Sequence, residues 1–224
     1  MKKAIWIVLF LLILAFELIS VTVNESIQFS TKPLLMPLLA IYLLLQTRSV
    51  QSNLKPWILL ALFFSWIGDI LLMFEQQKSI FFLLGLSAFL LAQVCYIFFF
   101  HGIRMREYIR GNELLLLLVL VYYAIMISIL SPFLGKMKLP VQIYGVVLSF
   151  MWMLAMHTIL GKKKRAGLWM IIGSILFVAS DSMLAFNKFY ARFEYAEIMI
   201  MLTYGLGQLF IVYGGVLYLK SGKA

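Results

Sequence analysis

Eight long apolar runs, separated by short polar connections, organise the chain from one end to the other. They lie at about 4–20, 31–46, 56–74, 79–100, 113–131, 138–160, 166–186 and 196–219. A membrane-spanning helix needs roughly 17–25 mostly apolar residues, and the runs are close to this length. The pattern therefore predicts an all-α integral membrane bundle of eight helices, with residues 1–224 forming one transmembrane domain.

Composition supports a membrane protein and narrows its chemistry. Hydrophobic residues make up 64% of the chain, charged residues only 12%, and the mean hydropathy is +1.01, outside the range of soluble domains. The single cysteine, Cys95, excludes a disulfide within one chain. His101 and His157 belong to different predicted spans, so no cluster of zinc ligands is expected. We predict that the protein uses no metal and no cofactor.

The connections carry unequal charge. Most of the 19 Lys and Arg residues fall near the two termini and in the connections after the second, fourth and sixth runs. Cytoplasmic loops are enriched in these residues, so we predict a multi-pass protein with both termini in the cytoplasm, placed in a bacterial inner membrane. The first run has no small-x-small cleavage site after it, which favours a retained span over a cleaved signal peptide. Because the net charge of +10 has this origin, we expect membrane lipids and no nucleic acid as partners.

The only two aspartates, Asp69 and Asp181, lie inside apolar runs, where a carboxylate costs roughly 2.5–3.5 kcal/mol on insertion scales. Each follows a small residue and is followed by Leu at +3 and Phe at +5. Gln93 and Gln208 in the next spans each follow an aromatic residue by four positions. This correspondence predicts a parallel repeat of four plus four spans, which would bring the two aspartates to facing positions.

Paired carboxyl groups in an apolar setting favour acid–base chemistry. One aspartate would stay protonated and act as a general acid, while the other stays ionised to stabilise a cation or activate water. This division suits reactions that pass through an oxocarbenium ion, as for vinyl ethers and acetals among bilayer molecules. We expect Asp181 to be the ionised member, stabilised by Ser180, Ser182 and Lys188, and Asp69 to be the acid.

Other interpretations stay open on these residues alone. Intramembrane aspartates in repeated spans also occur in proton-coupled transporters. A protein that only binds lipid, with aspartates that stabilise helix packing, is a third interpretation.

Several short motifs, in order, resemble the YhhN/TMEM86 lysoplasmalogenase family over essentially the whole chain. They are Lys-Pro at the second span, Gly-Asp in the third, Ser-Asp-x-x-Leu-Ala-Phe-Asn-Lys-Phe in the seventh and Tyr-x-x-x-Gln in the eighth. The resemblance implies hydrolysis of the vinyl-ether bond of lysoplasmalogens to a fatty aldehyde and a glycerophospho-alcohol. It implies these site residues: Lys32, Asp69, Asp181, Asn187, Lys188, Tyr204 and Gln208. The family often has a histidine in the fourth span where this chain has Gln93.

The predicted site is a single cavity that both aspartates line, open toward the outer leaflet. Asp69 and Asp181 would be catalytic, and Lys32, Asn187, Lys188, Tyr204, Gln208 and Gln93 would contact the substrate. Gln93 and Gln208 are expected two or three helical turns deeper than the aspartates, where they would orient the apolar tail or the bundle. Glu17, near the end of the first span, is expected to be solvated.

Overall fold

Eight α-helices make up most of the part of the chain that the structure describes, as the apolar runs predict. The computed structural model describes residues 2–23 and 25–221. Its α-helices are α1 (Lys2–Val23), α2 (Glu25–Gln46), α3 (Lys55–Met73), α4 (Ile80–Arg106), α5 (Glu113–Leu130), α6 (Lys138–His157), α7 (Lys164–Ala185) and α8 (Ala196–Lys220). Short 3-10 turns follow α5 and α6, and a π-helical turn, Phe186–Tyr190, extends α7. No strand occurs in the described part of the chain, so the predicted all-α class is confirmed.

Local sequence explains where several helices begin. Pro56 stands in the first turn of α3, where its missing N–H costs no hydrogen bond. Asn112 caps α5: its side-chain oxygen accepts a hydrogen bond from the Leu114 N–H at 2.9 Å. α2 and α4 are longer than their predicted spans, since α2 begins at Glu25 and α4 continues to Arg106. These extensions are polar, so the apolar pattern alone gave no sign of them.

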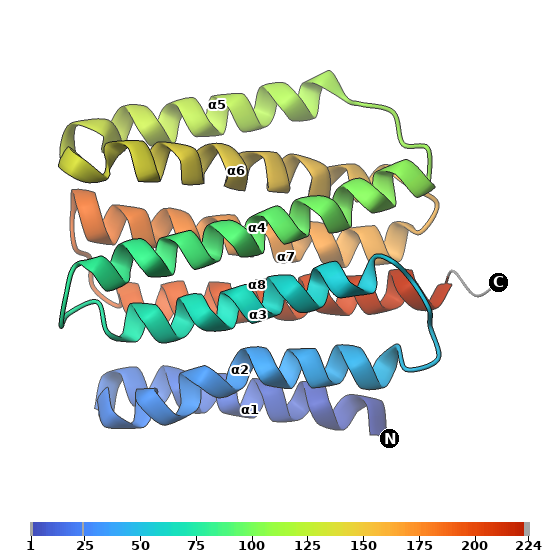
Figure 1. The fold of residues 1–224 in the computed structure, drawn as a ribbon, viewed down its shortest axis with the longest axis horizontal. Coiled ribbons are helices and arrows are strands. Elements are labelled where there is room, and N and C mark those ends of the chain that lie inside the picture. Colours follow the sequence, from blue (N-terminus) through green and yellow to red (C-terminus); the bar gives the residue numbers. More distant parts are fainter. Residues whose placement is uncertain (1, 24, 222–224) are drawn as a thin grey trace.

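The helices form a bundle in which consecutive helices run in opposite directions. In Figure 1, α3, α4, α7 and α8 form the middle, α1 and α2 one side, and α5 and α6 the other. α3 and α7 therefore run in the same direction, as a parallel repeat requires. The four-plus-four repeat itself stays a prediction. α1 begins, and α8 ends, at the same end of the bundle.

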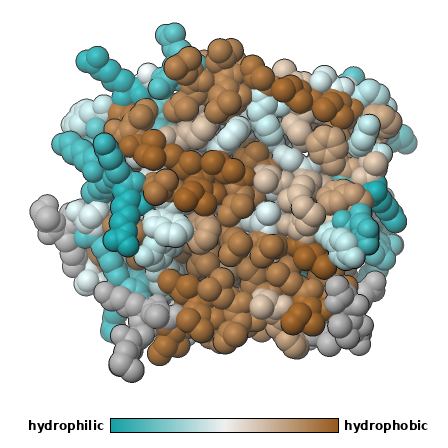
Figure 2. Space-filling model, turned by 180° about the vertical axis from the view of Figure 1, so that it is seen from behind, coloured by the Kyte–Doolittle hydropathy of each residue, from teal (hydrophilic) through white to brown (hydrophobic). Residues whose placement is uncertain are grey.

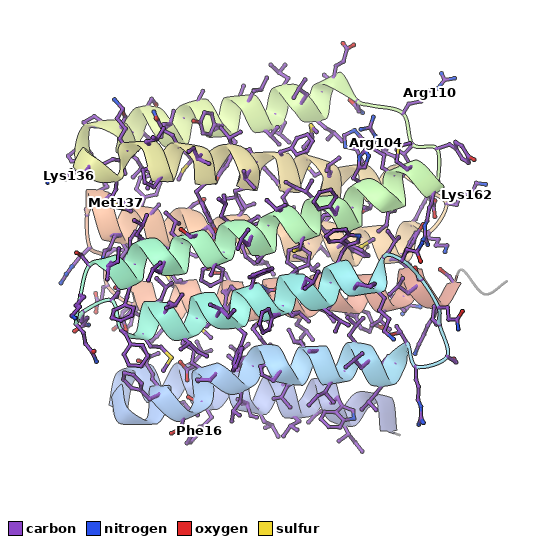
Figure 3. All side chains as sticks on the ribbon, viewed as in Figure 1. Phe16, Arg104, Arg110, Lys136, Met137 and Lys162 are labelled. Carbon is purple, nitrogen blue, oxygen red and sulfur yellow. The ribbon has the colours of Figure 1, made fainter. Side chains whose placement is uncertain are left out.

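The surface matches a membrane environment. Seven helices are long and apolar enough to cross a membrane, and the apolar stretch Ile5–Val21 of α1 is shorter than these. Figure 2 shows a broad hydrophobic band across the middle of one face, with hydrophilic side chains gathered at the two ends. Arg104, Arg110 and Lys162 lie at the end where α1 begins and α8 ends, and Lys136 lies at the opposite end (Figure 3). The protein is thus a multi-pass integral membrane protein.

α7 and α8 pack closely because glycines of each helix face the backbone of the other. A Cβ atom on Gly173 would lie 2.6 Å from the Ile211 nitrogen, and one on Gly207 would lie 2.9 Å from the Phe177 nitrogen. Small residues let membrane helices approach in this way. This packing fixes Asp181 on α7 relative to the polar residues of α8.

We expect Gly173→Ala to destabilise the protein by about 1–3 kcal/mol, the usual cost of overpacking. The added methyl group would meet the backbone of α8, which has no rotamer to move away. Thermal unfolding in detergent measures the effect. Gly145→Ala is the matched control, because its methyl group would meet only the edge of the Tyr123 ring, at 3.1 Å. Equal melting temperatures for the two variants would contradict the close packing.

Candidate functional site

Asp69 lies on the buried face of α3 and is only 2% exposed. Its Oδ2 accepts a hydrogen bond from the Tyr204 hydroxyl of α8 at 2.8 Å. The Tyr204 ring is held edge-on against Phe89 and Phe177, with ring centroids 5.8 and 5.7 Å away. Packing therefore fixes the hydroxyl that orients this carboxyl group.

Gln208 continues the polar chain one helical turn from Tyr204. It is fully buried, and its amide nitrogen donates to the Ser65 hydroxyl of α3 at 2.9 Å. Its amide oxygen accepts a hydrogen bond from the Tyr96 hydroxyl of α4 at 2.5 Å. Gln208 thus joins α3, α4 and α8 behind Asp69. It is not among the residues that line the cavity of Asp69, so the structure places it between helices, away from the substrate contact expected from the sequence.

Asp181 is held by residues from two other helices. Its Oδ2 accepts a hydrogen bond from the Tyr144 hydroxyl of α6 at 2.6 Å and a long one from the Gln93 amide of α4 at 3.5 Å. Tyr144 is buried and Gln93 is fully buried. Tyr144 is the one tyrosine of α6, but it was not foreseen from the sequence, because nothing along the chain shows which face of α6 turns toward α7.

The expected depth of Gln93 is wrong, since this residue reaches Asp181. Counting residues from the start of a span gives only the height of a Cα atom. It leaves out the reach of the Gln and Asp side chains and the different heights at which α4 and α7 begin. Gln93 therefore orients a carboxyl group of the site.

The expected partners of Asp181 are also wrong. Ser180 donates to the Ile200 carbonyl at 2.9 Å, and Ser182 donates to the Val178 carbonyl at 2.6 Å. Lys188 pairs with Glu75 at 3.3 Å. A helical serine readily donates to a carbonyl one turn earlier or on a neighbouring helix, so nearness in sequence did not bring these groups to Asp181.

Both aspartates line one cavity of about 490 Å³, which we call the acidic cavity. Its wall comes from α1, α2, α3, α4, α7 and α8 and includes exposed residues of the α3–α4 connection, Gln76 and Gln77. It therefore opens at the end of the bundle opposite the start of α1 and the end of α8. The shared cavity expected from the sequence is present. Its polar and charged wall residues include Glu17, Lys32, Asp69, Glu75, Asp181, Asn187 and Tyr204.

Glu17 is a wall residue that the sequence reading missed. It was expected to be solvated, but its side chain is fully buried. One carboxylate oxygen accepts hydrogen bonds from Thr31 and, at 3.4 Å, from Ser20. The other oxygen has no hydrogen-bond partner among the described residues. α1 continues to Val23, six residues beyond Glu17, and this longer helix is why Glu17 lies inside the bundle.

The remaining predicted residues lie around the opening. Lys32 on α2 is part of the cavity wall. The Asn187 side chain accepts a hydrogen bond from the Phe193 N–H at 3.4 Å and also lines the cavity. Lys188 lines a neighbouring outer recess of about 730 Å³ that shares Glu75 and Asn187 with the acidic cavity. Cationic, amide and carboxylate groups, the last from Glu75 and Glu197, thus lie near the entrance to the cavity that Asp69 and Asp181 line.

The three acidic residues Asp69, Asp181 and Glu17 each bond to different side chains and do not bond to one another. Within the described residues 2–23 and 25–221, no three His, Cys, Asp or Glu side chains are grouped as metal ligands. The arrangement defines a class: a multi-pass helical membrane protein with two hydrogen-bonded aspartates in one cavity.

Comparison with known proteins gives the family. The sequence pattern of the YhhN family matches residues 27–215, and the chain belongs to this family. The chain is 31% identical over 163 residues to proteins named lysoplasmalogenase from Mycobacterium bovis and Mycobacterium tuberculosis, covering 71% of this chain and 60% of each relative. It is 32% identical over 152 residues to the rat lysoplasmalogenase TMEM86B, covering 67% of this chain and 58% of that protein.

The matched region therefore spans about 60% of the length of these relatives. No solved structure matches this chain. The matched family region begins at residue 27, so Glu17 and α1 precede it.

Proposed function

We propose that the protein hydrolyses the vinyl-ether bond of lysoplasmalogens, giving a fatty aldehyde and a glycerophospho-alcohol. The observation that carries this proposal is that Asp69 and Asp181 line the same cavity. Two carboxyl groups facing one space are the arrangement that serves reactions through an oxocarbenium ion. Relatives named lysoplasmalogenase in mycobacteria and rat support the same substrate class.

The reaction needs one neutral and one ionised carboxyl group. The neutral aspartic acid donates its proton to the β-carbon of the vinyl ether, and the π electrons of the double bond form the new C–H bond. The ionised aspartate stabilises the resulting oxocarbenium ion. It also takes a proton from a water molecule as the oxygen of that water bonds to the α-carbon. The hemiacetal then separates into aldehyde and alcohol. No metal or organic cofactor takes part in these steps.

Neighbouring residues take two kinds of role in this proposal. Tyr204 and Gln93 hold the two carboxyl groups in place, together with Tyr144. Gln208 bonds α8, the helix of Tyr204, to Ser65 of α3 and Tyr96 of α4, and it has no hydrogen bond to either aspartate. Lys32, Asn187 and Lys188, at or near the opening, contact the glycerophosphate part of the lipid, because cations and amide groups there suit a phosphate.

Mass spectrometry tests the proposal directly. Purified protein in nanodiscs is incubated with a lysoplasmalogen, and the fatty aldehyde and the glycerophospho-alcohol are measured. Stoichiometric release of both products supports hydrolysis. Proton-dependent uptake into proteoliposomes without products would support a transporter, and binding without either would support a lipid-binding protein.

We also propose that both termini face the cytoplasm of a bacterium, with the protein in its inner membrane. Single-cysteine variants in a Cys95→Ala background test this orientation. Lys136→Cys should react with a membrane-impermeant thiol reagent in intact spheroplasts, and Lys162→Cys only after the membrane is broken. Both side chains are exposed, so accessibility depends on the side of the membrane alone. The reverse labelling pattern would contradict the charge-based orientation.

A further inference from the structure

A second, apolar pocket lies directly beside the acidic cavity. It has a volume of about 50 Å³ and lies among α3, α4, α6 and α7. We call it the apolar pocket. Its side walls are formed by Phe82, Leu86, Val141, Ala185 and Phe189. Four residues line both spaces: Leu72, Phe89, Asp181 and Leu184.

Among the described residues that line the apolar pocket, Asp181 is the one acidic residue, and Tyr144, its hydrogen-bond partner, is the one other polar residue. Asp69 lines the acidic cavity but not the apolar pocket. The two carboxyl groups therefore differ in what they face. Asp181 stands where polar and apolar space meet, and Asp69 stands within the polar space.

The proposed substrate also has a polar part and an apolar part that meet at one point. Its glycerophosphate is polar, its hydrocarbon chain is apolar, and the vinyl ether joins the two. Apolar groups gain free energy when they leave water or polar surroundings for an apolar pocket. With the glycerophosphate in the acidic cavity, the double bond falls at the junction of the two spaces, beside Asp181.

We propose that the apolar pocket binds the hydrocarbon carbons next to the vinyl ether, which makes Asp181 the proton donor and Asp69 the base. This inference rests on the proposed function. In a vinyl ether the β-carbon is on the chain side and the α-carbon on the glycerol side. Asp181 is therefore adjacent to the carbon that receives the proton, and Asp69 to the carbon that water attacks.

The hydrogen bonds of Asp181 fit this role. Both bonds from other helices reach Oδ2, from Tyr144 and Gln93. A protonated carboxyl group accepts hydrogen bonds on its carbonyl oxygen while the other oxygen carries the proton. Oδ1 then donates its proton to the β-carbon, the carboxylate of Asp69 takes a proton from the attacking water, and proton transfer through the acidic cavity restores both groups.

This assignment reverses the roles expected from the sequence. That expectation depended on Ser180, Ser182 and Lys188 as partners of Asp181, and all three bond elsewhere. Lys32 lines the acidic cavity, the one of the two spaces that Asp69 faces, whereas Asp181 also faces the apolar pocket, whose described wall residues include no Lys or Arg.

Filling the pocket tests the proposal through substrate selectivity. Ala185→Leu adds three carbons to a half-buried wall residue. We expect kcat/KM to fall by about tenfold or more for a long-chain lysoplasmalogen, since one methylene in an apolar pocket changes it by roughly 10–200-fold. An analogue with an unsubstituted ethenyl group has no chain to place there, so its kcat/KM should change much less. Ala124→Leu, on an exposed position of α5, is the matched control and should affect neither substrate.

An equal loss for both substrates, or no loss for the long chain, would overturn the proposal. Photolabelling of the wild-type protein gives a readout that needs neither turnover nor a variant. The probe is a saturated 1-O-alkyl lysophospholipid with a diazirine on the third carbon of its chain. Labelling should concentrate on α6 near Val141 and on α7 near Ala185, and unlabelled lipid should compete with it.

The two experiments separate the two proposals. Labelling at Val141 and Ala185 without any aldehyde from lysoplasmalogen would support the apolar pocket and contradict the proposed hydrolysis. Aldehyde formation with labelling spread over the lipid-facing helices would support hydrolysis and contradict the apolar pocket.

Discussion

Asp69→Asn and Asp181→Asn should each lower the rate of lysoplasmalogen hydrolysis by about 10²–10⁴-fold, the usual cost of removing a positioned acid or base. Asparagine keeps the size of aspartate, but it supplies no carboxylic proton and no carboxylate. The tyrosine hydroxyl that donates to each carboxyl group, Tyr204 at Asp69 and Tyr144 at Asp181, can donate in the same way to the amide oxygen of the asparagine. We therefore expect both variants to fold and to insert, and to lose mainly kcat.

The measurement is aldehyde release under saturating substrate, with the melting temperature of each variant recorded beside it. Glu75→Gln is a matched control, because Glu75 lies at the opening and pairs with Lys188 there. It should change KM more than kcat. Full activity of either aspartate variant would contradict a paired-carboxyl mechanism.

Rescue by azide should distinguish the roles of the two aspartates. Asp69→Asn retains the proposed proton donor, Asp181, but lacks the base that activates water. An added anionic nucleophile such as azide needs no base, so it should capture the oxocarbenium ion and restore turnover of Asp69→Asn. The product would be an α-azido ether, formed by a new C–N bond at the α-carbon and identified by its mass.

Asp181→Asn should not respond to azide, because without the proton donor no cation forms. Rescue of Asp181→Asn and not of Asp69→Asn would show that the roles are the reverse of those proposed. Rescue of neither variant at azide concentrations that leave the wild type active would contradict an oxocarbenium ion that is open to the acidic cavity.

The helices and the two aspartates followed from the sequence for physical reasons. Apolar runs of membrane length leave few structures other than helices, because the backbone must satisfy its hydrogen bonds internally. A charged residue inside such a run stands out against its neighbours, which is how Asp69 and Asp181 were found. The same reasoning placed them on α3 and α7, which run in the same direction.

The partners of these aspartates did not follow, because they are set by contacts between distant helices. Tyr144 is 37 residues from Asp181, and Tyr204 is 135 residues from Asp69. Which face of each helix turns inward depends on how α7 packs against α8 and α6. The pattern of apolar residues does not determine how far each helix is rotated about its own axis. Glu17 was missed for a related reason, since the end of α1 lies further along the chain than its apolar run.

The origin of the atoms in the products tests hydrolysis of the vinyl ether most directly. Purified wild-type protein is given a lysoplasmalogen in D₂O and, separately, in water enriched in ¹⁸O, and both products are analysed by mass spectrometry. Proton delivery to the β-carbon predicts one deuterium on the carbon beside the aldehyde group. Attack of water on the α-carbon predicts a glycerophospho-alcohol with no oxygen from solvent. A glycerophospho-alcohol that contains ¹⁸O, or an aldehyde without deuterium at that carbon, would contradict the proposed reaction.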